Sequence, residues 1–140
     1  PDGAATRRAS EAAGPRLASL EVAPFLDDVA SALGRASLVI SRAGAVTLAE
    51  ICAVGRAAVL VPLSIAAAHQ SANAGTLVAA GAARVVSGGD DLVDALGTLL
   101  AELLAAPETL AEMGRSSRAL ARPDAAAALA GRVTALVEAA

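Results

Sequence analysis

The sequence predicts an α/β fold in which a parallel sheet is flanked by helices. Short apolar runs rich in β-branched residues alternate along the chain with segments of helical periodicity, which is the pattern of repeated βαβ units. The chain has 140 residues, of which 56% are hydrophobic and 18% charged. This length and composition suit one domain with a sizeable buried core, so we treat residues 1–140 as one domain.

The chain opens with two short elements. Residues 6–16 have a weak helical pattern. Residues 20–23 (Leu-Glu-Val-Ala) predict a short strand, which ends at Pro24 because proline cannot donate to the ladder of a sheet.

A better defined helix follows. It begins after Asp27 and Asp28, because negative charge is favourable at a helix N-terminus. Its apolar stripe lies within residues 29–33, and Gly34 is expected to end it.

A strand and a helix with clear boundaries come next. Residues 37–41 (Ser-Leu-Val-Ile-Ser) predict a strand that is buried on both faces. Gly44 opens the following helix and Gly55 closes it. The apolar side of this helix is expected to consist of Leu48, Ile51 and Cys52.

The middle of the chain repeats this order. Residues 57–61 (Ala-Ala-Val-Leu-Val) predict a strand, residues 62–68 a loop of small residues and residues 70–80 a helix. Residues 83–87 predict a further strand.

Beyond Gly88 and Gly89 the periodicity is helical to the end. Leucines from Leu92 to Leu103 recur at spacings of three and four, Pro107 starts another helix, and Pro123 starts a last, alanine-rich one.

Composition excludes several classes of function. The 11 basic residues, all arginine, are outnumbered by 14 acidic ones, and aromatic residues make up 1% of the chain. This balance argues against nucleic acid as a partner, because both a basic footprint and a base-stacking platform are missing. One histidine and one cysteine without paired spacing predict no metal site, and we expect no cofactor.

The first segment whose residues suggest a binding site spans residues 41–50. After the strand, Gly44 begins a helix whose first residues Ala45, Val46 and Thr47 leave backbone N–H groups open, as in anion sites. Glu50 lies one turn further on, and its carboxylate suits two adjacent hydroxyls such as those of ribose. The alternative is an ordinary helix start with a solvated Glu50.

Arg42 precedes this helix start. Its guanidinium can approach a bound ligand or form a structural ion pair with a neighbouring acid. On the residues alone we favour the ion pair.

The second segment spans residues 62–73, where polar groups gather in an apolar region. His69, Gln70 and Asn73 lie in the first turn of the predicted helix, with Gln70 and Asn73 on one face, an arrangement that suits sugar hydroxyls. Alternatively, His69 or Ser71 merely caps the helix.

A catalytic nucleophile is not supported. Cys52 is expected on an inner helix face, where a free cysteine is usually inert, and no Gly-x-Ser-x-Gly motif occurs. We therefore assign no catalytic residue.

Four segments in order carry a family resemblance. Residues 24–28 (Pro-Phe-Leu-Asp-Asp), 41–50, 61–63 (Val-Pro-Leu) and 69–74 (His-Gln-Ser-Ala-Asn-Ala) resemble the C-terminal half of the MurG family of glycosyltransferases. The resemblance runs from about residue 18 to the end of the chain. Members of this family transfer GlcNAc from UDP-GlcNAc to undecaprenyl-diphospho-MurNAc-pentapeptide, converting lipid I to lipid II in peptidoglycan synthesis.

The resemblance implies the GT-B architecture, with two Rossmann-like lobes around a cleft, of which this chain is the UDP-GlcNAc-binding lobe. By analogy, the ring of Phe25 covers the uracil and the backbone of Leu26 reads its edge. The N–H groups after Gly44 meet the diphosphate, Glu50 the ribose, and Gln70 and Asn73 the GlcNAc. The substrate-binding set that the resemblance implies is Phe25, Leu26, Arg42, Gly44, Ala45, Val46, Thr47, Glu50, His69, Gln70 and Asn73. Helix N–H groups in place of a cation imply that no metal is needed.

Two departures from the family pattern shape our expectations. The first strand and Gly-Gly-Ser phosphate loop of such lobes are not found before Thr6, and the lobe that would bind lipid I is absent. We therefore expect this chain alone to show no turnover and weak or lost binding of UDP-GlcNAc. The full-length enzyme is expected to be cytoplasmic and peripheral at the inner face of the plasma membrane. An unprotected sheet edge further predicts self-association.

Three other interpretations of the function remain open. The chain could be a lobe of another GT-B transferase, a lobe of a UDP-GlcNAc epimerase, or a non-catalytic nucleotide-sugar-binding subunit that works with a separate chain. The His-Gln-x-x-Asn pattern favours the transferase over the epimerase, which would need more ionisable residues near the sugar.

Overall fold

The fold is known from a computed structural model, which describes residues 21–62, 67–87 and 89–139. Within these residues three strands form one parallel sheet in the order β1-β2-β3. The strands are β1 (Leu38–Ser41), β2 (Ala57–Leu60) and β3 (Ala83–Val85). Leu38 of β1 pairs with Ala57 of β2, and Ala58 of β2 pairs with Ala83 of β3. The predicted α/β class with a parallel sheet is confirmed.

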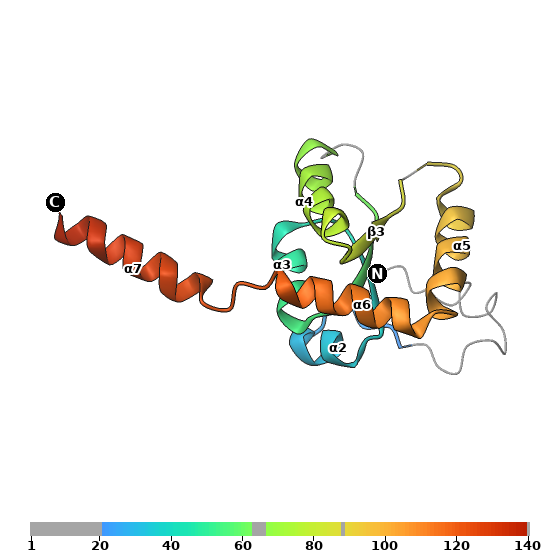
Figure 1. Cartoon of the computed structure of the whole chain (residues 1–140), viewed down its shortest axis with the longest axis horizontal. Coiled ribbons are helices and arrows are strands. Elements are labelled where there is room, and N and C mark those ends of the chain that lie inside the picture. The colour runs from blue at the N-terminus through green and yellow to red at the C-terminus, as the bar shows by residue number, and fades with distance from the viewer. Residues whose placement is uncertain (1–20, 63–66, 88, 140) are drawn as a thin grey trace.

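Six helices accompany the sheet in the described ranges (Figure 1). They are α2 (Val29–Arg35), α3 (Ala45–Val54), α4 (Ala67–Ala79), α5 (Leu92–Leu104), α6 (Pro107–Ala119) and α7 (Ala125–Glu138). Figure 1 shows α7 leading away from the body that the other elements form. No helix in the described parts of the chain is long and apolar enough to cross a membrane.

The central strand β2 divides the core into two layers. Its four residues are all buried, and they alternate between the two faces of the sheet because side chains along a strand have a period of two. Ala58 and Leu60 join a cluster with residues of α3 and α4, including Leu48, Ile51 and Leu77. Ala57 and Val59 join a second cluster with Leu103 of α5 and Met113 of α6. Helices therefore cover both faces of the sheet.

The boundaries of α3 agree with the sequence prediction. Gly44 is its N-cap and Gly55 its C-cap, with Gly55 at φ 71° in the left-handed region that favours glycine. The predicted apolar side is buried and consists of Leu48, Ile51 and Cys52.

The prediction that β1 is buried on both faces is wrong. Ile40 remains 48% exposed, and β1 is only partly buried along its length. The reason is its position: among the described strands β1 pairs with β2 only, so it lies at one end of the sheet.

The predicted strand over residues 20–23 is not formed in its described part. Residues 21–23 have no regular structure and are exposed. Because they pair with no described strand and bury little surface, nothing offsets the loss of conformational freedom that a strand requires. Residues 6–16, for which a weak helix is predicted, lie outside the described residues.

Several helix and strand ends differ from the predictions. α2 continues through Gly34 to Arg35, because Arg56 donates hydrogen bonds to the carbonyl oxygens of Leu33 and Gly34 and so satisfies the end of the helix. α4 begins at Ala67 rather than near Gln70, since alanine favours helix formation. β3 is shorter than predicted, and α7 begins two residues after Pro123.

Candidate functional site

The site predicted from the sequence lies where β1 and β2 end. Because the strands are parallel, the segments that follow Ser41 and Leu60 leave the same edge of the sheet. Two hydrogen bonds join these segments. The N–H of Val61 donates to the carbonyl oxygen of Ser41 at 2.9 Å, and Nη1 of Arg42 donates to the carbonyl oxygen of Val61 at 3.0 Å.

The role predicted for Arg42 is therefore corrected. No acidic side chain in the described ranges lies within ion-pair distance of Arg42, and its guanidinium binds a backbone carbonyl instead. A carbonyl oxygen at a strand end is a good acceptor for a guanidinium, but backbone groups leave no signal in the sequence pattern.

The amino end of α3 is open. No side chain caps it, Ala45 and Val46 are exposed, and Val46 is 74% exposed. A Cβ placed on Gly44 would meet no atom of residues 21–62, 67–87 and 89–139 within 4 Å. The first helical hydrogen bond runs from the N–H of Leu48 to the carbonyl oxygen of Gly44 at 3.0 Å. The N–H groups of the three residues before Leu48 thus have no acceptor in the helix, and no atom of the described residues fills the space at the Cβ position of Gly44.

Glu50 lies on the exposed side of α3. It is exposed, whereas Leu48, Ile51 and Cys52 on the other side are buried, and Thr47 is partly buried. The carboxylate is therefore free to face solvent or a ligand close to the open helix end, as the spacing predicts.

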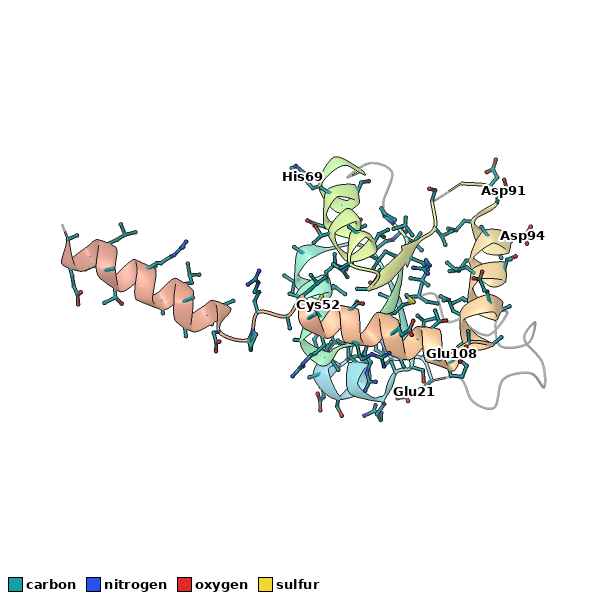
Figure 2. All side chains as sticks on the ribbon, viewed as in Figure 1. Glu21, Cys52, His69, Asp91, Asp94 and Glu108 are labelled. Carbon is teal, nitrogen blue, oxygen red and sulfur yellow. The ribbon has the colours of Figure 1, made fainter. Side chains whose placement is uncertain are left out.

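The first two turns of α4 carry the second group of predicted residues. His69 is exposed and points outward from the helix, as Figure 2 shows, while Gln70 and Asn73 are partly buried. Because α4 already begins at Ala67, His69 and Ser71 lie inside the helix, and neither caps it.

Asn73 brings the two segments together. Its side-chain Nδ2 donates to the carbonyl oxygen of Ala43 at 3.2 Å, across a sequence separation of 30 residues. Ala43 is fully buried just ahead of the open end of α3. The residues predicted for the sugar and those predicted for the phosphates thus belong to one connected edge of the molecule. The sequence predicts that Asn73 shares one helix face with Gln70, but it does not indicate this bond.

Phe25 and Leu26 lie ahead of α2 and are exposed, Phe25 by 76% and Leu26 by 50%. Phe25 therefore does not belong to the core that the described residues form. Leu26 lines a shallow hollow of about 380 Å³ together with Ala32 and Arg35 of α2. No hydrogen bond within the described residues joins Phe25 or Leu26 to α3.

The described residues contain no group of three or more His, Cys, Asp and Glu side chains that could hold a metal ion. Cys52 is buried, as predicted for an inner helix face.

The chain matches the model of a known protein family. Residues 5–129 match the family described as glycosyltransferase family 28 C-terminal domain. The match includes both segments at the edge described above.

Similar proteins carry the name UDP-N-acetylglucosamine--N-acetylmuramyl-(pentapeptide) pyrophosphoryl-undecaprenol N-acetylglucosamine transferase. The one from Halorhodospira halophila is 54% identical over 106 residues, which cover 75% of this chain and 30% of that protein. The one from Maricaulis maris is 48% identical over 115 residues, which cover 81% of this chain and 31% of that protein.

A solved structure agrees in fold. The crystal structure of Acinetobacter baumannii MurG superposes with a TM-score of 0.77 at 37% identity, covering 83% of this chain and 33% of that one. The chain thus spans about a third of the length of the relatives that it matches.

Proposed function

The chain belongs to glycosyltransferase family 28, whose C-terminal domain it matches, and on this basis we propose that it is the UDP-GlcNAc-binding part of a hexosyltransferase. The complete enzyme transfers GlcNAc from UDP-GlcNAc to undecaprenyl-diphospho-MurNAc-pentapeptide, the reaction that the names of its relatives describe. The observation that carries the proposal is the open amino end of α3, which is connected to α4 through Asn73 and Ala43.

The diphosphate of the donor binds at this helix end. The N–H groups of Ala45, Val46 and Thr47 donate to phosphate oxygens, and the helix dipole adds about 0.3–1 kcal/mol for each suitably placed negative charge. The missing Cβ of Gly44 lets the phosphates approach the backbone closely. The chain contains no lysine, so backbone donors and Arg42 are the groups that meet this charge.

Glu50 accepts hydrogen bonds from the two ribose hydroxyls. Its exposed carboxylate follows the open N–H groups by one helical turn, which matches the order of phosphate and ribose in a nucleoside diphosphate. A carboxylate has two acceptor oxygens and can serve two neighbouring hydroxyls at once.

The two ends of the donor meet different elements. Phe25 offers an exposed ring on which the uracil stacks, and the backbone of Leu26 pairs with the edge of the base. His69, Gln70 and Asn73 at the start of α4 face the GlcNAc. Of these three side chains, Asn73 is joined to the loop ahead of α3 by its hydrogen bond to the carbonyl oxygen of Ala43.

The chemical contribution of this part of the enzyme is stabilisation of the departing UDP. As the bond from the sugar to the diphosphate breaks, negative charge grows on the phosphate oxygens, and the preorganised N–H groups of α3 stabilise that charge. The group that accepts the proton of the attacking hydroxyl, and the surface that binds lipid I at the inner face of the plasma membrane, belong to the part of the relatives that this chain does not span. We therefore expect donor binding without turnover from this chain.

A nuclear magnetic resonance titration tests the proposal. Adding UDP or UDP-GlcNAc to the chain should shift the amide signals of Ala45, Val46 and Thr47, with dissociation constants on the order of 1 mM for a single lobe. Uridine, which lacks the diphosphate, serves as control and should leave these three signals in place. If about 10 mM UDP moves none of them, the proposed diphosphate site is wrong.

A second candidate, the non-catalytic binding subunit, predicts the same binding. The two are separated by a transfer assay on the complete reading frame with UDP-GlcNAc and a lipid I analogue. Turnover supports the enzyme, whereas binding without turnover by a complete protein supports the subunit.

A further inference from the structure

The bond between Asn73 and Ala43 holds the peptide unit that leads into the start of α3. The carbonyl oxygen of Ala43 belongs to the peptide that leads into Gly44, the N-cap of α3. Gly44 has no side chain, and among the residues that the structure describes no atom lies within 4 Å of its Cβ position. The buried side chain of Ala43 restrains this peptide on one side, but Gly44 on the other side has the widest choice of backbone conformations, so the contact from Asn73 adds a restraint that Gly44 does not supply.

Side-chain hydrogen bonds hold the loop over residues 42–44 at both ends, and Oγ of Ser41 also donates to the carbonyl oxygen of Arg42 at 3.0 Å. At its start, Nη1 of Arg42 donates to the carbonyl oxygen of Val61, and near its end Asn73 donates to the carbonyl oxygen of Ala43. The bond from Asn73 comes from α4, an element that follows a different strand. The direction of the open N–H groups of α3 thus depends on a side chain of α4.

From this geometry we propose that Asn73 is a positioning residue for the diphosphate site, acting through the carbonyl oxygen of Ala43. The inference rests on the proposed function and deepens it, because it makes Asn73 important for the phosphates as well as for the sugar. A residue that touches only the GlcNAc would have no effect on UDP, which ends at the phosphates. A positioning residue affects UDP and UDP-GlcNAc alike.

Asn73→Asp is the most informative substitution. Aspartate has nearly the same shape as asparagine, but its ionised carboxylate has no hydrogen to donate and places an acceptor against the acceptor oxygen of Ala43. Asn73 is partly buried, and a charge introduced there can disturb the fold by itself. Asn73→Ala is therefore a second variant, which removes the bond without adding charge. Ser71→Ala is the matched control, since Ser71 is exposed on the same helix.

Binding is measured by the same titration with UDP and with UDP-GlcNAc. We expect both Asn73 variants to lose roughly tenfold in affinity for UDP, and at least as much for UDP-GlcNAc, with Ser71→Ala unchanged. If UDP binds the Asn73 variants as it binds the wild type while only UDP-GlcNAc binding falls, Asn73 contacts the sugar alone and the inference is overturned.

A measurement without ligand separates this inference from the proposed function. Losing the bond should change the carbonyl ¹³C shift of Ala43 and raise the fast backbone mobility of Gly44 in ¹⁵N relaxation, whereas Ser71→Ala should change neither. If the ¹³C shift of Ala43 and the backbone mobility of Gly44 are unchanged in the Asn73 variants, the hydrogen bond from Asn73 to Ala43 does not exist and the inference fails. If they do change but the wild type binds no UDP, the hydrogen bond from Asn73 to Ala43 is only structural. In that case the proposed function fails, and the positioning role of Asn73 fails with it.

Discussion

Gly114 of α6 lies directly against Gly55 at the end of α3, so that a Cβ added to Gly114 would be 2.9 Å from the carbonyl oxygen of Gly55. This close approach lets α6 pack on both α3 and β2. Beside it, the fully buried Ser117 donates a hydrogen bond to the carbonyl oxygen of Ile51 at 3.5 Å. Glycine at position 114 therefore fixes how the last helix of the body sits on the helix that carries the site.

Replacing Gly114 tests this contact. Gly114→Ala should lower the free energy of unfolding by about 1–3 kcal/mol, because the added methyl group meets a backbone atom and the two helices must separate. Urea unfolding followed by circular dichroism measures the change. Gly97→Ala is the control: Gly97 lies inside α5 with nothing within 4 Å of its Cβ position, so alanine should stabilise by about 0.5–1 kcal/mol. Equal effects at the two positions would contradict this account of the packing.

Arg56 is predicted to stabilise the end of α2. Its guanidinium donates to the carbonyl oxygens of Leu33 and Gly34. Arg56→Gln should cost about 1–2 kcal/mol of unfolding free energy, since partly buried carbonyls would lose their partners. Arg132→Gln on the exposed helix α7 removes the same charge without such bonds, and we expect it to change stability by less than about 0.5 kcal/mol. A loss as large for Arg132→Gln would mean that net charge, not the bonds, explains the effect.

Glu50 should determine recognition of the ribose. Glu50→Gln is expected to weaken UDP binding by about 10- to 100-fold, the amount that hydrogen bonds to a charged group represent, without a change in unfolding free energy because the side chain is exposed. The decisive comparison uses 2′-deoxy-UDP, for which the substitution should matter less. Glu102→Gln, on the exposed side of α5, is the control and should bind UDP normally. The ribose role is wrong if the variant loses equal affinity for both nucleotides.

Self-association through the end of the sheet is the fourth prediction. Ile40 on β1 is 48% exposed, and β1 pairs with one described strand only, which leaves an edge that a second copy can meet. Sedimentation velocity at micromolar concentrations should show a dimer whose fraction rises with concentration, and Ile40→Lys should reduce it. Val93→Lys, at a 79% exposed position on α5, should leave the dimer unchanged. A monomer at every concentration would overturn the prediction.

Periodicity was enough to predict most elements of this fold. The helix α3 illustrates this, because Gly44, Gly55 and the apolar spacing of Leu48, Ile51 and Cys52 act through local backbone freedom and one-sided burial. The strand β2 is equally clear, since a continuous apolar run suits a strand covered on both faces. The predicted strand over residues 20–23 failed because its apolar run has no described neighbour to pair with.

Some features of the candidate site likewise follow from neighbouring residues, whereas others depend on contacts between distant segments. The uncapped start of α3 and the exposure of Glu50 depend on neighbouring residues, so the spacing was sufficient to predict these two features, while their binding roles stay predictions. Arg42 was assigned an ion pair but binds the carbonyl oxygen of Val61, because a backbone acceptor brought near by folding cannot be read from side-chain identities.

The amino-acid order by itself determined the α/β class, the helix ends at Gly44 and Gly55, and the buried side of α3, since these depend on local backbone preferences and periodic burial. Only the tertiary structure decided that Asn73 meets Ala43, that Arg56 holds the end of α2, and that Gly114 must lie against Gly55. The physical reason is that hydrogen bonds and close contacts between distant segments depend on where the strands direct the chain, and parallel pairing of β1 with β2 sets that direction.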